Sequence, residues 1–418
     1  MAIAFSTAIV IGANAPAIYT AAQPTSANTA ESSTVSTAVL DEVWQLVDRS
    51  YIDPAFNGQD WDAVRQDYLN RTYASQEEVY DAAQEMLGLL GDSLTRFLDP
   101  QEFSNIQVEP DSVGIGLLVA EDEETQEIVI VGTLEDTPAF ETDILPEDIL
   151  LTIDGETVQG MGTTEVVTRL RGPVGTSVTL TVQREQNEQT YTLTRVPVEL
   201  VSVRHRLEET PAGNIGYIRL TRFDARATEN MQQAIQDLEQ QSIGYILDLR
   251  GNMGGLLQVG INIADLWLQE GTIVSLVDRT GVVEQSQASQ TALTTKPLVV
   301  LVDGATASAS EILAAALQEN QRATLVGTQT YGSNLIQSVR GLEGDTGVAI
   351  TVAKWLTPSG ADVNQSGITP DVTVELTPEQ NETIRRDRAF GTTADPQYQQ
   401  AIQLLTSSSN RSHFELED

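Results

Sequence analysis

The chain has 418 residues, of which 40% are apolar, with 30 glycines and 15 prolines, a composition typical of folded proteins of two or more domains. Its 60 acidic residues outnumber 23 basic ones, and the net charge of −37 disfavours nucleic acids and anionic membranes as partners. Cysteine is absent and the only histidines are His205 and His413, which excludes disulfides and thiolate nucleophiles and disfavours a metal centre.

The first 27 residues are mostly apolar and end in small residues, "MAIAFSTAIVIGANAPAIYTAAQPTSA". This pattern is typical of a secretory leader, with cleavage near Ala22 or Ala27, and it predicts an exported protein. The usual basic residues before the apolar run are missing. A truncated start would explain this, and so would a buried helix or one that associates with a membrane.

Residues 28–110 are expected to be helical. Val39, Val43 and Val47 recur on one helical face, and Ser75 followed by Glu78 predicts a capping box at the start of a later helix. The stretch "GDSLTRFLDPQEF" (91–103) has turn-forming residues and closes this segment.

Residues 111–197 read as a small separate module rich in strands. One helix is expected among them, at 163–172. The predicted strands are 113–120, 127–134, 148–155, 177–184 and 190–196.

Residues 198–375 alternate between apolar strand-like runs and helical patterns from position 214 onward. Continuous apolar runs are typical of strands covered on both faces, so a largely parallel α/β core is expected. Residues 376–418 form an extension whose helix begins at Asp395 and Pro396. The fold class predicted is therefore α+β to α/β, with a mixed sheet.

Two loops that follow predicted strands carry the chemistry, because α/β proteins bind ligands at the carboxyl ends of parallel strands. The loop "DLRGNMGGLL" (248–257) has a glycine-rich backbone, and "VDGATASASEI" places Ser308 at the start of a helix. Free amides there would stabilise an oxyanion and suit acyl transfer. Ser308 and Glu311 also form a capping-box pattern that requires no catalysis, and glycine after a strand is often only a turn.

A serine nucleophile needs a group that accepts its proton, and the sequence offers no evident one. His205 lies in charged "VRHRLEE" and His413 lies in the terminal tail. Lys296 precedes a strand in a polar loop, and Lys354 lies inside the predicted strand "TVAKWLT".

Long, ordered motifs resemble the carboxyl-terminal processing (tail-specific) proteases, which are serine–lysine endopeptidases with an inserted PDZ domain. The likeness covers nearly all of the chain after the leader, and its cyanobacterial and chloroplast branch is the most similar. The motifs include "GDSLTRFLDPQEF", "VGIGLLV", "RLRGPVGTSVTLTVQR", "ILDLRGNMGGLL", "PLVVLVDGATASASEILAAALQENQRATLVGTQTYG" and "TPSGADVNQSGITPD". The resemblance implies a helical N-terminal part, a PDZ domain at 111–197, a mixed-sheet protease core at 198–375 and a helical extension.

The resemblance implies that Ser308 is the nucleophile. It places the oxyanion amides at Gly254 and Ala309, puts Glu311 near the site, and makes Gln337 the residue that orients the base. No metal or cofactor is implied.

The family's base lysine belongs in a segment of the form T-[FY]-G-K-G, but here the stretch is "TYGSNLIQ". Ser333 occupies the lysine position and Asn334 the next glycine. A serine hydroxyl has no basic pKa near neutrality and cannot replace the amine. Met253, where proline is usual, and Glu147, where glycine is usual, are lesser departures.

The PDZ likeness implies that backbone amides in "VGIGL" bind the carboxylate of a protein or peptide C-terminal tail, which adds as a strand. The same loop could also be an ordinary strand start. Arg171 is expected to link this domain to the core, or to be a surface arginine. The loop residues are Val113, Gly114, Ile115, Gly116 and Leu117.

Two functions remain open. The first is a processing endopeptidase of the periplasm or thylakoid lumen with impaired activity, using a water held by Ser333 and Gln337, or Lys354, as base. The second is a pseudoprotease that binds C-terminal peptides as an adaptor. A homo-oligomer or a homologous active partner is compatible with either. In a photosynthetic source, the resemblance implies trimming of the photosystem II reaction-centre protein precursor.

The acidity and the scarcity of lysine, with only Lys296 and Lys354, form the basis of a first prediction. If the charge is an adaptation to high salt, counterions screen its self-repulsion, and the melting temperature should rise between low and molar sodium chloride. Thermal unfolding followed by circular dichroism measures this. An unchanged melting temperature would indicate instead an acidic protein from an ordinary environment.

Overall fold

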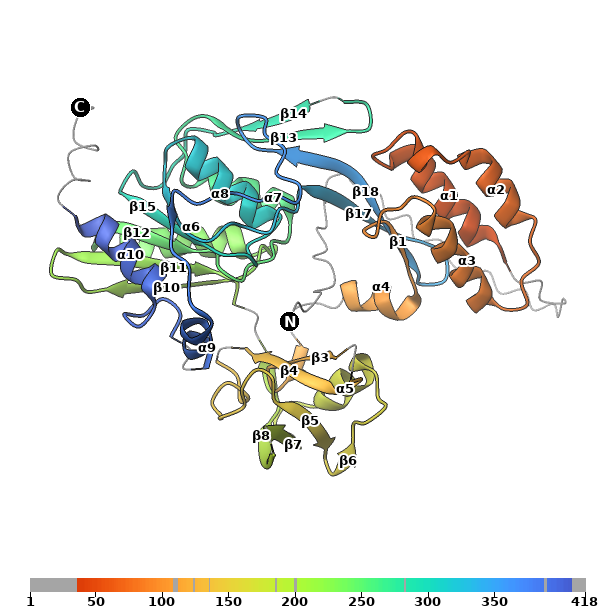
Figure 1. The fold of residues 1–418 in the computed structure, drawn as a ribbon, viewed down its shortest axis with the longest axis horizontal. Coiled ribbons are helices and arrows are strands. Elements are labelled where there is room, and N and C mark those ends of the chain that lie inside the picture. Colours follow the sequence, from red (N-terminus) through yellow and green to blue (C-terminus); the bar gives the residue numbers. More distant parts are fainter. Residues whose placement is uncertain are drawn as a thin grey trace. The chain divides into compact units, whose positions relative to one another are not determined.

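The structure is a computed structural model that describes residues 36–107, 112–122, 125–134, 136–184, 186–198, 201–281, 283–386 and 389–407. The predicted leader and the last eleven residues lie outside these ranges. The chain divides into two compact units (Figure 1). The core unit comprises residues up to 106, 202–377 and from 390, and the second unit comprises 107–201 together with 378–389.

The N-terminal part of the core unit is helical, as the sequence predicts. Val39, Val43 and Val47 are buried in one apolar cluster with residues of the following helices. Ser75 caps its helix by accepting from the Glu78 amide at 3.2 Å. The elements are α1 (Ala38–Ser50), the short helix η1 (Phe56–Gly58), α2 (Trp61–Leu69), α3 (Gln76–Gly88), β1 (Arg96–Leu98) and α4 (Pro100–Gln107).

A six-stranded sheet forms the centre of the core unit. Its first strand is antiparallel to the second, and the other neighbours are parallel. The strand order is β10 (Val203–Glu208), β11 (Asn214–Leu220), β12 (Ser242–Asp248), β15 (Leu298–Val302), β16 (Thr324–Gly327) and β19 (Val372–Thr373). This confirms the parallel α/β core.

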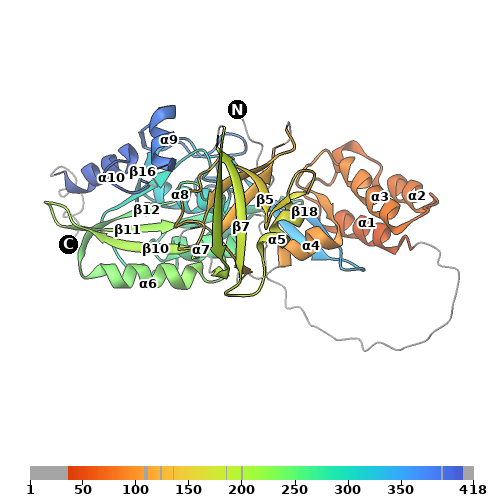
Figure 2. The same ribbon diagram turned by 90° about the horizontal axis from the view of Figure 1, so that it is seen from below.

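Helices cover both faces of this sheet. Along β15, Leu298, Val300 and Val302 pack with three helices on one face, while Val299 and Leu301 pack on α10 (Pro396–Thr406) on the other. Figure 2 shows α6 and α10 on opposite sides of the strands. The three helices are α6 (Ala227–Glu239), α7 (Leu257–Asp265) and α8 (Ala309–Glu319).

A second, antiparallel sheet joins this core to the N-terminal helices. From its place in the alternating pattern, the run 347–356 was expected to extend the parallel sheet, and this expectation is wrong. The run pairs with β1, β13 and β17 instead. Its Val348 and Ile350 pack on the N-terminal helices, whereas Trp355 packs in the central core. The strands are β13 (Thr272–Asp278), β14 (Val283–Gln287), β17 (Leu335–Gly341) and β18 (Gly347–Leu356).

The second unit is a small β-rich domain with its own apolar core. The predicted strand 113–120 is in fact two strands separated by Ile115 and Gly116. Residues 378–386, assigned from sequence to the C-terminal extension, form a helix that belongs with this unit. Its elements are β2 (Ser112–Gly114), β3 (Leu117–Glu121), β4 (Ile128–Thr133), β5 (Ile149–Ile153), β6 (Glu156–Thr157), α5 (Thr163–Leu170), β7 (Ser177–Arg184), β8 (Asn187–Thr194), β9 (Val196–Val198) and α9 (Pro378–Arg386).

A buried ionic network fastens α10 to the end of β12. The Arg250 guanidinium lies 2.6 Å from Asp248 and 2.7 Å from Asp395, the N-cap of α10, and it also donates to Gln397. Burial alone would raise the pKa of Asp248, but the charge and hydrogen bonds of Arg250 hold it below its ordinary value. Arg250, which lies at the start of the glycine-rich loop 248–257, therefore compensates the buried carboxylates of Asp248 and Asp395.

Replacing Arg250 with methionine should lower the free energy of unfolding by about 3–5 kcal/mol, because two buried carboxylates lose their cation. Since the pKa of Asp248 is depressed in the wild type, its contribution is present above the unfolded-state pKa and is lost as pH falls through the folded-state value. The wild-type stability should therefore fall with acid more steeply than that of Arg250→Met. Urea denaturation between pH 3 and 7 measures both effects.

The matched control is Arg222→Met, which removes an exposed arginine 3.7 Å from Asp224. A surface pair contributes at most about 1 kcal/mol. If the two variants lost equal stability, the buried network would not be what anchors α10.

Candidate active site

Ser308 lies in the connection between a strand of the parallel sheet and the helix that follows it. It follows β15 and immediately precedes α8, and it is 5% exposed. Its backbone has φ +57° and ψ −118°, which a residue with a side chain rarely adopts. A serine that only caps a helix has an extended backbone and no such strain, which costs about 1–3 kcal/mol. The geometry thus favours a functional reading over simple capping.

The glycine-rich loop lies directly against this turn. A Cβ added to Gly254 would lie 2.9 Å from the Ser308 Cβ and 2.8 Å from the Ala307 carbonyl oxygen, so only glycine fits. The Gly254 amide donates to the Asn252 Oδ1 at 2.9 Å. Within the described residues, the Ala309 amide has no hydrogen-bond partner. Both predicted oxyanion amides therefore lie next to Ser308, in a corner formed by residues 252–254 and 307–309. The Gly254 amide is bonded to Asn252, whereas the Ala309 amide has no partner among the described residues.

Glu311 connects the segments of the corner by accepting hydrogen bonds from them. Its side chain is fully buried, and its two carboxylate oxygens accept from four groups. The Ser308 and Ser333 amides donate to Oε2, each at 2.9 Å, and the Gly332 amide and the Thr330 hydroxyl donate to Oε1. Burial raises the pKa of Glu311, and the four donors partly offset that rise.

Ser333 is held close to Ser308 by this shared carboxylate. Its amide and that of Ser308 bind the same oxygen of Glu311, and its carbonyl accepts from the Trp355 indole at 3.1 Å. The position that holds lysine in the family pattern therefore adjoins Ser308, and here it offers only a hydroxyl.

The two other residues considered as helpers have different contacts. Gln337 is 3% exposed and donates to the Leu94 carbonyl oxygen, and no described contact joins it to Ser308 or Ser333. Lys354 donates to Asp362 at 2.9 Å. Because side chains alternate along a strand, Lys354 lies on the face of β18 opposite to Trp355, whose indole reaches Ser333.

His205 and Lys296, the other candidate bases within the described ranges, have partners away from Ser308. His205 is exposed on β10 and lies 3.2 Å from Asp237. Lys296 donates to the Glu239 carbonyl oxygen before β15 begins, at the end of that strand opposite to Ser308. His413 is outside the described residues.

The predicted peptide-binding loop is found in the second unit. Ile115 and Gly116 connect β2 to β3, and Gly116 has φ +78°, with Thr137 packed where a Cβ would be. Their carbonyls accept from Ala139 and Leu134, but their amides have no partner among the described residues. β3 is an edge strand that pairs with β4 alone and contacts α5. Arg171 is exposed at the end of α5.

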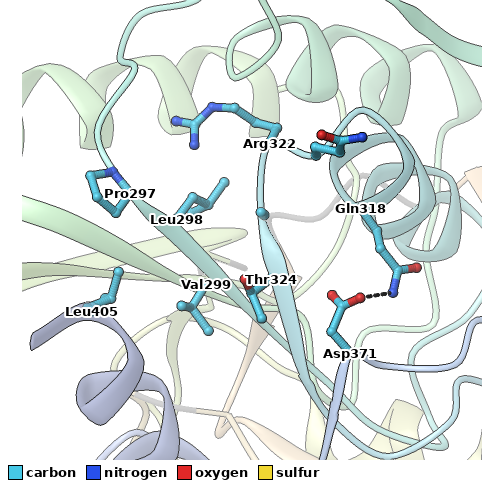
Figure 3. A pocket seen from close by; sticks show the side chains of 10 residues that line it. Pro297, Leu298, Val299, Gln318, Arg322, Thr324, Asp371 and Leu405 are labelled. Atoms are coloured by element: carbon cyan, nitrogen blue, oxygen red, sulfur yellow. Dashed lines mark hydrogen bonds between the residues drawn. The ribbon is translucent and has the colours of Figure 1, made fainter. Parts of the chain in front are cut away.

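A pocket of about 250 Å³ lies elsewhere on the core unit (Figure 3). It is lined by Pro297 and Leu298 at the start of β15 and by Thr324 at the start of β16, with Gln318 hydrogen-bonded to Asp371 at one side. These are the amino ends of the strands, opposite to the end that leads into Ser308. The pocket is therefore separate from the candidate active site.

The fold and corner define a serine-hydrolase-type core that carries a PDZ domain. The sequence matches Peptidase family S41 over residues 214–374, a PDZ domain over 105–183 and the Tricorn protease C1 domain over 37–88. It is 44% identical to the carboxyl-terminal-processing protease of Synechocystis sp., covering 88% of this chain and 86% of that protein. It is 38% identical to the chloroplastic carboxyl-terminal-processing peptidase 2 of Arabidopsis thaliana, covering 79% and 67%.

A solved structure of the photosystem II D1 C-terminal processing protease has a TM-score of 0.64 and 33% identity, covering 87% of this chain and 99% of that one. The chain belongs to the carboxyl-terminal-processing proteases of peptidase family S41. This confirms the resemblance and the fold class drawn from the sequence. No helix in the described part of the chain is long and apolar enough to span a membrane.

Several residues of the corner were not singled out from the sequence. Asn252 is completely buried, donates to the Leu220 carbonyl oxygen at 2.7 Å and accepts from Gly254. Thr330 donates to Glu311 and also accepts from the Ile368 amide. Asn252 lies inside the glycine-rich motif, and Thr330 is the first residue of the "TYGSNLIQ" segment. The hydrogen bond from Thr330 to Glu311 could not be read from that segment, because it depends on tertiary placement.

Replacing Glu311 with glutamine should lower the free energy of unfolding by about 2–4 kcal/mol. The amide would keep one acceptor oxygen and would place an N–H₂ against two donors, so two of the four hydrogen bonds are lost. Chemical denaturation measures the change.

Glu270→Gln, at an exposed position, is the matched control and should stay near wild-type stability. Wild-type stability in Glu311→Gln would show that the carboxylate does not organise the corner.

Proposed function

We propose that the chain is a processing endopeptidase that acts near protein C-termini with strongly impaired turnover. The supporting observation is the shared Glu311 oxygen, which keeps Ser308 and position 333 adjacent while position 333 carries no amine. In this proposal Ser308 is the nucleophile, the Ala309 and Gly254 amides form the oxyanion site, and position 333 supplies no base. Ser308, Gly254, Ala309 and Glu311 keep the roles that the family pattern implies.

The chemical step explains the impairment. The Ser308 Oγ attacks the substrate carbonyl carbon, the carbonyl oxygen gains negative charge beside the Ala309 and Gly254 amides, and the hydroxyl proton must leave at the same time. That proton is later needed by the departing amine nitrogen. A positioned acid–base group contributes roughly 10²–10⁴ in rate, and Ser333 cannot supply it.

Two groups could accept the proton in place of the lysine amine, Lys354 and a water molecule held by Ser333. Lys354 is paired with Asp362 and lies on the opposite face of its strand from the Ser333 contact, which argues against it. A water held by the Ser333 hydroxyl is the better candidate for residual turnover. Gln337 would assist only if it exchanged its bond to Leu94 for one to this water.

The substrate is a protein or peptide C-terminal tail, recognised by the PDZ domain. The amides of Ile115 and Gly116, which have no partner among the described residues, can bind a terminal carboxylate, and the open edge of β3 can pair with the preceding residues. Val113, Gly114 and Leu117 frame this loop. The cyanobacterial and chloroplast relatives support a place in the periplasm or thylakoid lumen.

A second function, that of an adaptor, is supported because the loop at Ile115 and Gly116 can bind a tail without any reaction at Ser308. Its amides belong to a separate unit with its own core and need no catalysis to bind a tail. The chain could therefore act as an adaptor, alone, as an oligomer, or beside a homologous active protease.

Cleavage assays separate the two functions. A peptide with an apolar C-terminal tail is incubated with the wild type, Ser308→Ala and Ser333→Lys, and products are followed by mass spectrometry. We expect slow cleavage by the wild type that Ser308→Ala abolishes. Ser333→Lys should raise kcat/KM by about 10²–10⁴. Asn334→Gly is added to Ser333→Lys, because the buried Asn334 stands where the family has glycine.

The contrary outcomes are distinct. No detectable cleavage by the wild type, with activity in Ser333→Lys, would establish the adaptor with an intact corner. Cleavage that persists in Ser308→Ala would refute the assignment of the nucleophile.

A further inference from the structure

Two large apolar side chains of the core unit are exposed, and both flank Ser308. Met253 is 39% exposed and Tyr331 is 64% exposed. The other exposed large apolar side chains within the described ranges, Leu118, Val174 and Val201, belong to the second unit. Single exposed apolar residues are common on proteins, but here the two within one unit gather at one turn.

Hydrogen bonds place the two loops on either side of that turn. The Ala307 amide donates to the Asn252 carbonyl oxygen at 3.0 Å, next to Met253. The Tyr331 amide donates to the Thr306 carbonyl oxygen at 3.0 Å. Two loops far apart in the sequence thus bind consecutive residues immediately before Ser308, and each presents an apolar side chain to solvent.

Both backbones are firmly held, so the exposure is not that of a loose loop. The Asn252 side chain joins Leu220 to Gly254, and the Gly254 carbonyl accepts from the Phe223 amide at 3.1 Å. On the other side, Glu311 binds the Gly332 amide and the Thr330 hydroxyl. Because the backbone of both loops is already fixed, binding of a ligand to Met253 and Tyr331 would not carry the entropic cost of ordering a loop.

We propose that Met253 and Tyr331 are specificity-determining residues that bind apolar side chains on the two sides of the substrate's target peptide bond. The proposal rests on the proposed function only in that a polypeptide segment enters the Ser308 corner. Tyr331 lies two residues before position 333, from which a proton would reach the departing amine, so Tyr331 contacts the leaving-group side. Met253, adjacent to Gly254 and the oxyanion corner, contacts the acyl side.

A binding assay tests this without requiring turnover. The probe is a fluorescein-labelled peptide with two adjacent leucines in a Gly–Ser sequence. Its C-terminus is amidated, which removes the carboxylate that the PDZ amides would bind. The full chain carries Ser308→Ala to prevent cleavage, and anisotropy gives Kd. Two further peptides replace one leucine or the other with serine.

Met253→Ser and Tyr331→Ser should each weaken binding of the two-leucine peptide about tenfold. Tyr331→Ser should have no further effect on the peptide that lacks the leaving-side leucine, and Met253→Ser none on the one that lacks the acyl-side leucine. Val174→Ser is the control, since Val174 is an apolar residue of the second unit that is 58% exposed, and it should bind as the parent does.

Met253→Leu and Tyr331→Phe should retain parental affinity. Unchanged binding by each serine variant of the peptide that lacks its matching leucine excludes misfolding as the cause of a loss. Parental affinity in both serine variants, or no binding of the amidated peptide by the parent, would overturn the proposal. Neither result depends on whether the wild type cleaves, so failure of catalysis and failure of these contacts are distinguished.

Discussion

The buried carboxylate of Glu311 holds together the segments that surround Ser308. It joins the start of α8 to the segment 330–333, which follows β16, and so fixes two loops from different parts of the sheet edge. Its hydrogen bond with the Ser308 amide also helps to hold a backbone conformation that is strained for serine. A hydrogen bond to a charged acceptor contributes about 1.5–3 kcal/mol, which is comparable with the cost of that strain.

Because Glu311 binds the amides of Gly332 and Ser333, the corner does not depend on which side chain stands at position 333. A lysine there can be lost without loss of the backbone hydrogen bonds that hold Ser308, Gly332 and position 333 together. In the function that we propose, this is how a complete scaffold is combined with the loss of the base. Catalytic chemistry and local architecture are separable here, since one resides in a side chain and the other in backbone hydrogen bonds.

Much of the fold could be predicted from the sequence, for physical reasons. Apolar periodicity along 214–302 identified the parallel strands and their helices, because strands buried on both faces leave a continuous apolar pattern. The role of 347–356 as an antiparallel strand could not be predicted, since an apolar run does not show which strand it pairs with.

At the site, the Ser308–Glu311 spacing indicated a cap. The positive φ of Ser308 and the capture of Gly332 and Ser333 by Glu311 arise only when distant segments pack together. For the same reason, sequence alone did not show that Gln337 binds the Leu94 carbonyl.

The acidic composition restricts how any such protein can recognise a carboxylate-terminated tail. A net charge of −37 repels an anionic ligand at long range, but at physiological ionic strength charges are screened beyond about 8 Å. Capture must then come from short-range contacts, and the Ile115 and Gly116 amides, which no other described residue binds, are donors of that kind. The same reasoning applies at Ser308, where the Ala309 amide and the side chains of Met253 and Tyr331 offer hydrogen-bonding and apolar contacts. Recognition that relies on backbone amides and apolar burial loses little as salt increases, and this makes it compatible with a strongly acidic surface.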